Sequence, residues 1–347
     1  WEQRKFSELY ARSSEKNDGS IGMDKNITVA TMQFKNDVKV STTEYLKTYY
    51  TFKLGDIAFE GHQSKEFRYG RFVENDIGNG IVSHIFAVFR PIQEYDLYFW
   101  KYAINNETLM QRILARSTKA STMMHDLVTN DFLNETFLVP SVKEQKQIGA
   151  FLNKLDNLIT LHQRKCEQTK KLKKYMLQKM FPQNGAKVPE IRFDGFTYDW
   201  EQRKLGDEAE EILAGGDIDK EKAVDDGVYP IYANALTNDG IVGYYDDYYR
   251  VKAPAVTVTG RGEVGRARAR MIDFTPVVRL LAVRSNHDCY FLENAINNHK
   301  VVVESTGVPQ LTVPQLSSYD ICFPKDIVEE KKIGTYFNQL DRLITLH

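Results

Sequence analysis

The sequence has no long apolar run, few cysteines and almost no net charge. No stretch approaches the roughly 20 apolar residues that a membrane-spanning helix needs, and no signal peptide opens the chain, so we expect a cytoplasmic protein. The three cysteines, Cys166, Cys289 and Cys322, have no paired spacing, which argues against a disulfide framework and a zinc site. A formal net charge of −1 argues against an autonomous nucleic-acid binder.

Catalytic signatures are also missing. The sequence contains no Gly-x-Ser-x-Gly, His-Glu-x-x-His, Walker A or Cys-x-x-Cys motif, and no amino-methyltransferase motif. The aspartate pairs at 225–226 and 246–247 have no evident basic or metal-binding partner and are interpreted as turn residues. We therefore expect no catalytic residue, cofactor or metal site in this chain.

What the chain does contain is an internal duplication. WEQRK at residues 1–5 recurs at 200–204, a shift of 199 positions. EQKQIGAFLNKLDNLITLH at 144–162 recurs as EEKKIGTYFNQLDRLITLH at 329–347, a shift of 185, so the two repeats differ in length by 14 residues. The segments between these edges share almost nothing by eye. A chain of 347 residues is long enough for two domains, and the pattern predicts two different binding surfaces on one duplicated scaffold.

Residues 142–181 have the apolar spacing of one long helix with an imperfect heptad seam. About 40 helical residues make a rod of roughly 60 Å. Because its apolar stripe must be buried, we expect the two copies of the repeated helix to pack together as an antiparallel coiled coil. The alternative is that each helix packs only on its own domain. The predicted packing residues are Ile148, Leu155, Leu158 and Ile159 in the first copy and Ile333, Leu340, Leu343 and Ile344 in the second.

Charge is distributed unevenly along the chain. Residues 144–199 carry a net charge of +5, whereas residues 200–347 carry −6. The basic residues gather between Arg164 and Lys179. They form either a solvated helix face or a surface for DNA phosphates or an acidic partner. Because Trp1 lacks the lead-in that precedes Trp200, we expect the natural chain to be slightly longer.

Both segments between the repeated edges have short β-rich runs broken by turns, which predicts two mixed α/β domains. In the second, the letters AVTVTGRGEVGRARAR at 255–270 contain G-x-G-x-x-G after a strand-like run, a dinucleotide-binding signal. A dinucleotide fold needs a helix after the third glycine. Here arginines alternate with period two, which is typical of a strand. We therefore interpret the glycines as a turn between two strands.

Arginines on that strand are candidate DNA contacts. Side chains on one strand face lie roughly 6 to 7 Å apart, comparable to the step between phosphates, so Arg266, Arg268 and Arg270 suit a DNA strand. Arg261, at the turn, is free to reach a base edge, where guanine is its best partner. A solvated strand face is the alternative. In the first domain the polar segment 61–71 is predicted to be the corresponding loop, with the candidate contacts His62, Gln63, Lys65, Arg68 and Arg71.

Together these features resemble the specificity subunit of a Type I restriction-modification enzyme. The resemblance is carried by two helices that follow a proline, begin Glu-x-Lys-x-Ile-Gly and contain Leu-Ile-Thr-Leu-His. The WEQRKL opening at 200–205, its FDGFT lead-in at 193–197 and the LKKYMLQKMFP helix end at 172–182 fit the same family.

The resemblance implies an α+β fold. Two mixed α/β target-recognition domains, at 1–141 and 200–326, would be joined by repeated spacer helices at 142–181 and 327–347, with a connector at 182–199. Each domain would read one half of a bipartite double-stranded DNA site. Two methylation subunits carrying S-adenosylmethionine would dock on the helices, and restriction subunits would join them. The chain itself would be a non-catalytic DNA-recognition subunit.

Two other function classes stay open. A coiled-coil adaptor would keep the helices and use its two domains to bind proteins. A nucleotide-dependent oxidoreductase would use the glycines at 260–265. Substituting Arg261, Arg266 and Arg268 tests the first alternative, and calorimetric titration with nucleotides tests the second.

Overall fold

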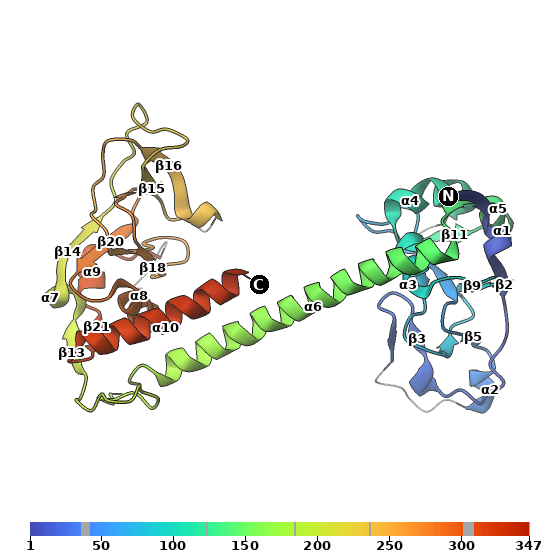
Figure 1. Cartoon of the computed structure of the whole chain (residues 1–347), viewed down its shortest axis with the longest axis horizontal. Coiled ribbons are helices and arrows are strands. Elements are labelled where there is room, and N and C mark those ends of the chain that lie inside the picture. The colour runs from blue at the N-terminus through green and yellow to red at the C-terminus, as the bar shows by residue number, and fades with distance from the viewer. Residues whose placement is uncertain (36–41, 122–123, 184, 236, 301–308, 347) are drawn as a thin grey trace. The chain divides into compact units, whose positions relative to one another are not determined.

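The computed structural model describes residues 1–35, 42–121, 124–183, 185–235, 237–300 and 309–346 (Figure 1). The chain divides into two compact units, Trp1–Thr160 and Leu161–His347, and each unit has its own core. Among the described residues, no helix is both long enough and apolar enough to cross a membrane.

The first unit is a mixed α/β domain. Its strands are β1 (Glu2–Lys5), β2 (Tyr10–Ser13), β3 (Ile27–Thr28), β4 (Gln33–Phe34), β5 (Tyr50–Phe52), β6 (Ile57–Glu60), β7 (Arg71–Glu74), β8 (Gly80–Val82), β9 (Ala87–Pro91), β10 (Thr118–Ala120), β11 (His125–Leu127) and β12 (Thr136–Val139). Its helices are α1 (Phe6–Leu9), η1 (Met23–Lys25), α2 (Thr43–Leu46), α3 (Leu97–Ile104), α4 (Glu107–Ser117) and α5 (Thr129–Asn134), followed by the start of α6 (Val142–Lys179).

The second unit contains the rest of α6 and a second mixed domain. Its strands are β13 (Glu201–Lys204), β14 (Ala209–Ala214), β15 (Tyr229–Tyr232), β16 (Ile241–Tyr245), β17 (Ala255–Val258), β18 (Ala267–Arg270), β19 (Thr275–Pro276), β20 (Leu281–Ser285) and β21 (Asp320–Phe323). Its other helices are α7 (Leu205–Glu208), η2 (Thr237–Gly240), α8 (Cys289–Asn298), α9 (Val313–Ser317) and α10 (Ile327–Leu346).

Both units are built on the same four-stranded antiparallel sheet. The strand order is β2-β9-β6-β7 in the first unit and β14-β20-β17-β18 in the second. In each unit the repeated WEQRK letters form an edge strand that pairs with the last strand of the domain, β1 with β12 and β13 with β21. The duplication therefore continues through the segments whose sequences share almost nothing.

A helix covers one face of each four-stranded sheet. Phe99 of α3 packs in one core cluster with Ile57 of β6, and Phe291 of α8 packs in the equivalent cluster with Val256 of β17. Both helices begin at an aspartate N-cap, which satisfies one of the otherwise unpaired amides of the first turn. The Asp96 carboxylate accepts from the Phe99 amide at 2.8 Å, and the Asp288 carboxylate accepts from the Phe291 amide at 2.9 Å.

The glycine of each repeated Ile-Gly pair lets a long helix approach that cap closely. A Cβ atom on Gly149 of α6 would lie 2.2 Å from Asp96 Oδ1, and one on Gly334 of α10 would lie 2.1 Å from Asp288 Oδ1. Contacts this short do not occur between real atoms, so any larger residue would push the helix away. The repeated motif is thus a docking motif between a long helix and its own domain.

Inside the second unit, α10 also packs antiparallel on the C-terminal part of α6 (Figure 1). The Cys166 thiol lies 3.7 Å from the Ile344 carbonyl, and Lys173 pairs with Asp341 at 2.6 Å. Phe181, just beyond α6, packs on Phe337 of α10. In these three contacts the residue number increases along α6 while it decreases along α10, so the two helices are antiparallel, as predicted. The partner of α10 is the tail of α6, which is not repeated, whereas the sequence had suggested that the repeated copies pair.

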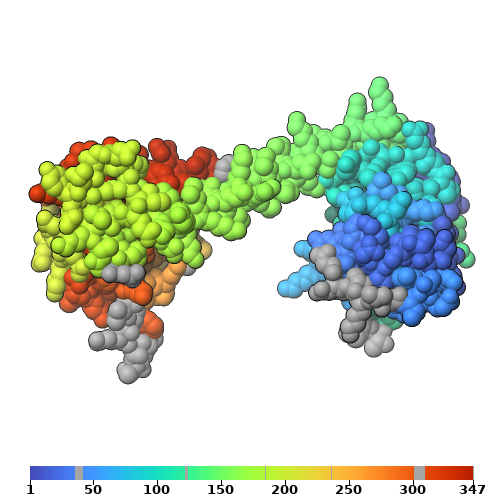
Figure 2. Space-filling view, turned by 90° about the horizontal axis from the view of Figure 1, so that it is seen from below, coloured from blue at the N-terminus to red at the C-terminus, as the bar shows by residue number. Residues whose placement is uncertain are grey.

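The predicted packing residues differ in exposure between the copies. In α10, Ile333 and Leu340 are buried and Ile344 is half-buried, while Leu343 is 44% exposed. In α6, Ile148 packs against the core of the first unit, but Leu155, Leu158 and Ile159 are 40%, 42% and 54% exposed. Side chains of α6, in green, line the molecular surface in Figure 2. His347, which ends the second copy, lies outside the described residues.

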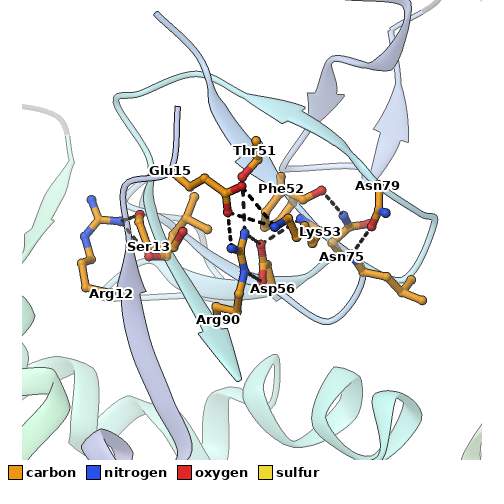
Figure 3. A network of polar contacts seen from close by, with 12 residues as sticks. Arg12, Ser13, Glu15, Thr51, Phe52, Lys53, Asp56, Asn75, Asn79 and Arg90 are labelled. Carbon is orange, nitrogen blue, oxygen red and sulfur yellow. Dashed lines mark hydrogen bonds and ion pairs between the residues drawn. The ribbon is translucent and has the colours of Figure 1, made fainter. Parts of the chain in front are cut away.

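An ion-pair network around the buried Asp56 ties three parts of the first unit together (Figure 3). Arg90 of β9 donates to both carboxylate oxygens of Asp56, at 2.9 Å each, and also pairs with Glu15. Lys53 pairs with the same Glu15 at 3.0 Å. The Arg90 hydrogen bond is the largest of the effects that lower the pKa of Glu15 to about 2, with Lys53 adding to it. The network joins the loop after β2 to the start of β6.

Candidate nucleic-acid interface

The two predicted recognition loops occupy the same place in the two sheets. One connects β6 to β7, and the other connects β17 to β18. Each has a glycine at or next to both ends, Gly61 and Gly70 in the first unit and Gly260 and Gly265 in the second. The loops differ in length and in sequence between those glycines. They are therefore equivalent positions that carry different chemical groups.

A close backbone approach explains the first glycine of each loop. The Gly61 carbonyl accepts from the His125 amide at 2.8 Å, and the Gly260 carbonyl accepts from the Leu311 amide at 2.9 Å. A Cβ atom would lie 2.2 Å from the His125 oxygen in one case and 2.3 Å from the Arg279 oxygen in the other. The glycines serve a turn between antiparallel strands, as predicted, and no helix follows Gly265 to make a dinucleotide site.

Three of the four predicted arginines of the second unit are exposed. Arg261 lies in the loop and makes no ion pair with another described residue. Arg266 pairs with Glu263 at 2.9 Å, and Arg268 pairs with Asp239 at 2.6 Å. Both paired arginines keep about half of their side-chain surface exposed, at 52% each. These three guanidinium groups are therefore accessible to solvent.

Arg270 departs from the prediction of three solvent-facing arginines. Its side chain is only 8% exposed and pairs with Asp239 at 2.6 Å. Its guanidinium carbon lies 3.7 Å from the centre of the Tyr232 ring, and its Nε donates to the Thr257 hydroxyl at 3.1 Å. The period-two pattern correctly places Arg268 and Arg270 on one face of β18. The Arg270 end of that face is buried, because Tyr232 and Asp239 cover it. Arg270 therefore supports the surface and does not form part of it.

Several residues near these arginines were not among the predicted site residues. Asp239 and its neighbour Asn238 have positive φ angles of 55° and 49°, and the Asn-Asp-Gly letters at 238–240 are the turn signal that could have marked them. Val278 and Arg279 also have positive φ, at 44° and 64°. Such backbone is uncommon for residues other than glycine and gathers at functional sites.

Asn234 joins the turn at Val278 to the predicted loop between β17 and β18. Its side-chain oxygen accepts from the Gly260 amide at 2.8 Å, and its side-chain nitrogen donates to the Val278 carbonyl. Arg279 donates to Gln310 at 2.6 Å. Nothing in the local sequence marks Asn234, because its partners lie 26 and 44 positions away.

The corresponding loop of the first unit is polar and mostly exposed. His62, Gln63, Lys65 and Arg68 are exposed, whereas Arg71, the first residue of β7, is half-buried. Arg71 pairs with Glu60 at 2.8 Å and donates to the Ala30 carbonyl at 2.7 Å. Four of the five predicted contacts are thus presented to solvent, and Arg71 is held at the base of the loop.

Part of the basic segment of α6 is engaged within the second unit. Lys173 pairs with Asp341, Lys170 with Glu167 on the same helix, and Lys179 with Glu190. These pairs favour the interpretation of this segment as a solvated and helix-packing face over a continuous phosphate-binding track. Among the described residues, no group of three or more histidine, cysteine or acidic side chains is placed to hold a metal ion.

Known proteins share this organisation. The family model described as Type I restriction modification DNA specificity domain matches residues 1–171 and 198–347. Two relatives from Mycoplasma pneumoniae, each named as a type I specificity subunit, are 27% identical over 237 residues and 30% identical over 148 residues. The first match covers 64% of this chain and 62% of the relative, and the second covers 41% and 43%. The chain thus spans less than two thirds of either relative.

Solved structures agree in fold. The crystal structure of a Type I restriction-modification system S subunit from M. genitalium aligns over all of this chain and 90% of that chain, with 15% identity and a TM-score of 0.64. A structure on complex assembly and conformational transition of the type I R-M system aligns over all of this chain and 91% of that chain, with 15% identity and a TM-score of 0.53. The α+β fold with two recognition domains and long helices is confirmed.

Proposed function

Because the chain belongs to the family of Type I restriction modification DNA specificity domains, we propose that it is the DNA-recognition subunit of a Type I restriction-modification complex. In this proposal the two units read the two halves of a bipartite double-stranded DNA site. The chain contributes DNA recognition and assembly, while its partner subunits carry out methylation and restriction.

One observation carries the proposal: the same sheet occurs twice, with different loops at the same position. The loop between β6 and β7 presents His62, Gln63, Lys65 and Arg68, and the loop between β17 and β18 presents Arg261 and Arg266. Base edges in the major groove are distinguished by their pattern of donors and acceptors, so different side chains at equivalent positions suit different base sequences. A duplicated frame with divergent loops is what a reader of two unlike half-sites requires.

The near-neutral charge fits a subunit that does not bind DNA alone. Phosphate contacts supply most of the sequence-independent affinity for DNA, and base contacts supply the specificity. A chain with a net charge of −1 carries no overall excess of cations for phosphate neutralisation. We therefore propose that the assembled complex provides much of the phosphate contact and that this chain provides the base contacts.

We further propose that two methylation subunits, each carrying S-adenosylmethionine, dock on the long helices and that restriction subunits join them. Exposed apolar side chains on α6 support a docking surface: Phe151 is 62% exposed and Ile159 is 54% exposed. Replacing both by serine should abolish co-purification with the methylation subunits. Ile272, which is 58% exposed in the second unit, gives a control, since Ile272→Ser removes one exposed apolar side chain away from the helix and should leave assembly intact.

The proposed function is tested by sequencing methylated adenines in cells with and without the gene. We expect a motif of two short half-sites separated by a fixed gap, present only when the gene is expressed. Unchanged methylation under proven expression of all subunits would contradict the proposal. A protein-binding adaptor would give that unchanged result.

A further inference from the structure

The carboxylate of Asp239 holds two arginines of β18 at once. Its Oδ1 lies 2.6 Å from an Nη atom of Arg268, and its Oδ2 lies 2.6 Å from an Nη atom of Arg270. The two arginines differ sharply in exposure, since the Arg270 side chain is 8% exposed and the Arg268 side chain is 52% exposed. One acid thus connects a buried cation to an exposed one.

The position of Asp239 is fixed from the buried side. Besides its ion pair, Arg270 donates to the Asp239 carbonyl at 3.1 Å and to the Thr257 hydroxyl at 3.1 Å, and it stacks on Tyr232. The backbone of Asp239 has a positive φ of 55°, a conformation that persists only where surrounding contacts hold it. Arg270 supplies those contacts.

The backbone of Arg268 is held as well. It lies opposite Thr257 in the register of β17 and β18, and its carbonyl accepts from the Thr257 hydroxyl at 3.2 Å. With the strand and one end of the guanidinium fixed, Arg268 loses little conformational freedom on binding a partner. A guanidinium has five donors in a planar fork, so the ion pair with Asp239 leaves donors on the exposed side. Two of them match the O6 and N7 acceptors of guanine.

The neighbouring arginines do not pair with a carboxylate fixed in this way, although hydrogen bonds with Thr259 hold the backbone of Arg266. Arg266 pairs with Glu263, an exposed residue three positions away in the same loop. Arg261 pairs with no other described residue. Flexible cations of this kind suit phosphates, whose contacts position a protein without reading sequence.

We propose that Asp239 is a positioning residue that fixes Arg268 to recognise one guanine in the half-site read by the second unit. This inference rests on the proposed function of DNA recognition. It assigns different roles to arginines that the sequence pattern does not distinguish. Arg268 reads a base, Arg266 contacts phosphate, and Arg270 with Asp239 supports Arg268.

The test uses the complex reconstituted from the full chain and its methylation subunits. Its probes are duplexes with the motif methylated in cells, duplexes with each base pair replaced in turn, and an unrelated duplex. Arg268→Ala should reduce discrimination at one base pair by roughly tenfold or more. Arg266→Ala should weaken binding to every duplex by a similar factor and flatten the salt dependence. Equal weakening by Arg268→Ala across all duplexes would overturn the assignment of Arg268.

The positioning role is tested by Asp239→Asn against Glu263→Gln. Both remove one negative charge beside an arginine of the same hairpin, so both should leave affinity for the unrelated duplex unchanged or higher. Only Asp239→Asn should lose discrimination at the base pair affected by Arg268→Ala. Wild-type discrimination in a folded Asp239→Asn variant would overturn the role of Asp239.

A folding defect is separated from these outcomes by thermal unfolding and by one further variant. Arg268→Lys keeps the charge but not the planar fork, and it leaves the Asp239 pair with Arg270 in place. It should lose discrimination at the same base pair while retaining affinity for the unrelated duplex, and retained discrimination would overturn the inference. If the wild-type complex preferred no duplex, the proposed function itself would fail.

Discussion

At the scale of single residues, buried charge makes some ion pairs far more important than others. The Asp56 side chain is 1% exposed and depends on Arg90, whose side chain is 27% exposed. Lys53 and Glu15 form a pair whose side chains are 47% and 45% exposed. Exposed pairs contribute little because water already solvates both charges. A buried carboxylate that loses its partner has no such compensation.

Arg90→Ala should therefore destabilise the first unit by about 3 kcal/mol, the lower end for breaking a buried pair because Arg90 is partly exposed. Lys53→Ala is the matched control and should cost at most about 1 kcal/mol. Chemical denaturation of the full chain measures both changes. Equal effects of the two substitutions would contradict the role assigned to Asp56.

A second residue-scale prediction concerns pH and His287 of the second unit. His287 lies between Glu330, at 2.9 Å, and Glu208, at 3.0 Å. Burial alone would lower the pKa of His287, but the hydrogen bonds and charges of the two glutamates outweigh burial and raise its pKa. Glu208 also pairs with Arg203 at 2.9 Å, and the imidazole stacks on Phe323. Protonated His287 therefore stabilises the folded unit.

Because the folded pKa is raised, this stabilisation is complete below the unfolded pKa of about 6.5 and is lost as the pH rises through the folded pKa. The melting temperature of the wild-type chain should exceed that of His287→Gln most at about pH 6, and the difference should shrink toward pH 9. A difference that stays constant over this range would show that protonation of His287 does not contribute.

Single residues also show where sequence reasoning ends. The alternation of Arg266, Arg268 and Arg270 predicts that they share a strand face. Arg268 and Arg270 lie in β18 and both pair with Asp239, whereas Arg266 precedes the strand. How deeply each arginine is buried depends on Tyr232 and Asp239, which come from other segments of the chain. No local pattern contains that information, so the burial of Arg270 could not be predicted.

At the scale of elements, the glycine-bounded loop between two strands is the unit to which we assign recognition. In both sheets the first loop glycine touches a backbone carbonyl of another segment. That contact fixes the base of the loop and leaves its tip free to vary. The pattern of short β-rich runs predicted these strands and turns well, because alternation and glycine are local signals.

Gly260→Ala should distort the base of the second loop, since its Cβ atom would lie 2.3 Å from the Arg279 oxygen. We expect a loss of about 1–3 kcal/mol from overpacking and weaker reading of the half-site assigned to the second unit alone. Gly216→Ala is the control, because its Cβ would meet only the flexible end of Arg250, at 3.3 Å. Thermal unfolding and motif sequencing record the two effects, and similar losses in both variants would contradict the close-approach argument.

The long helices show both a success and a limit of prediction at this scale. Their extent and antiparallel pairing follow from apolar periodicity and connectivity. The heptad pattern is similar along α6, however, so it does not say which stretch α10 covers. Contacts such as Lys173 with Asp341 and Phe181 with Phe337 select the tail of α6. This choice depends on the three-dimensional path of the connector.

At the scale of the whole molecule, the same four-stranded sheet and docked helix occur twice and carry different loops. The repeated edges were visible in the sequence because identical strands and docking helices keep identical residues. The shared strand order of the segments between them was not visible in the sequence, because a sheet tolerates many combinations of apolar residues if the alternation is kept. Asp96 and Asp288, the caps on which Gly149 and Gly334 pack, show that the frame continues where sequence identity stops.

The most direct test of this account exchanges residues 6–140 for the corresponding segment of another specificity chain, leaving the repeated edges and α6 in place. Methylated adenines are then sequenced in cells that express the hybrid with its methylation subunits. We predict that one half-site changes to that of the donor while the other half-site stays the same. A hybrid that assembles and methylates DNA but alters both half-sites would contradict the claim that the two units read DNA independently.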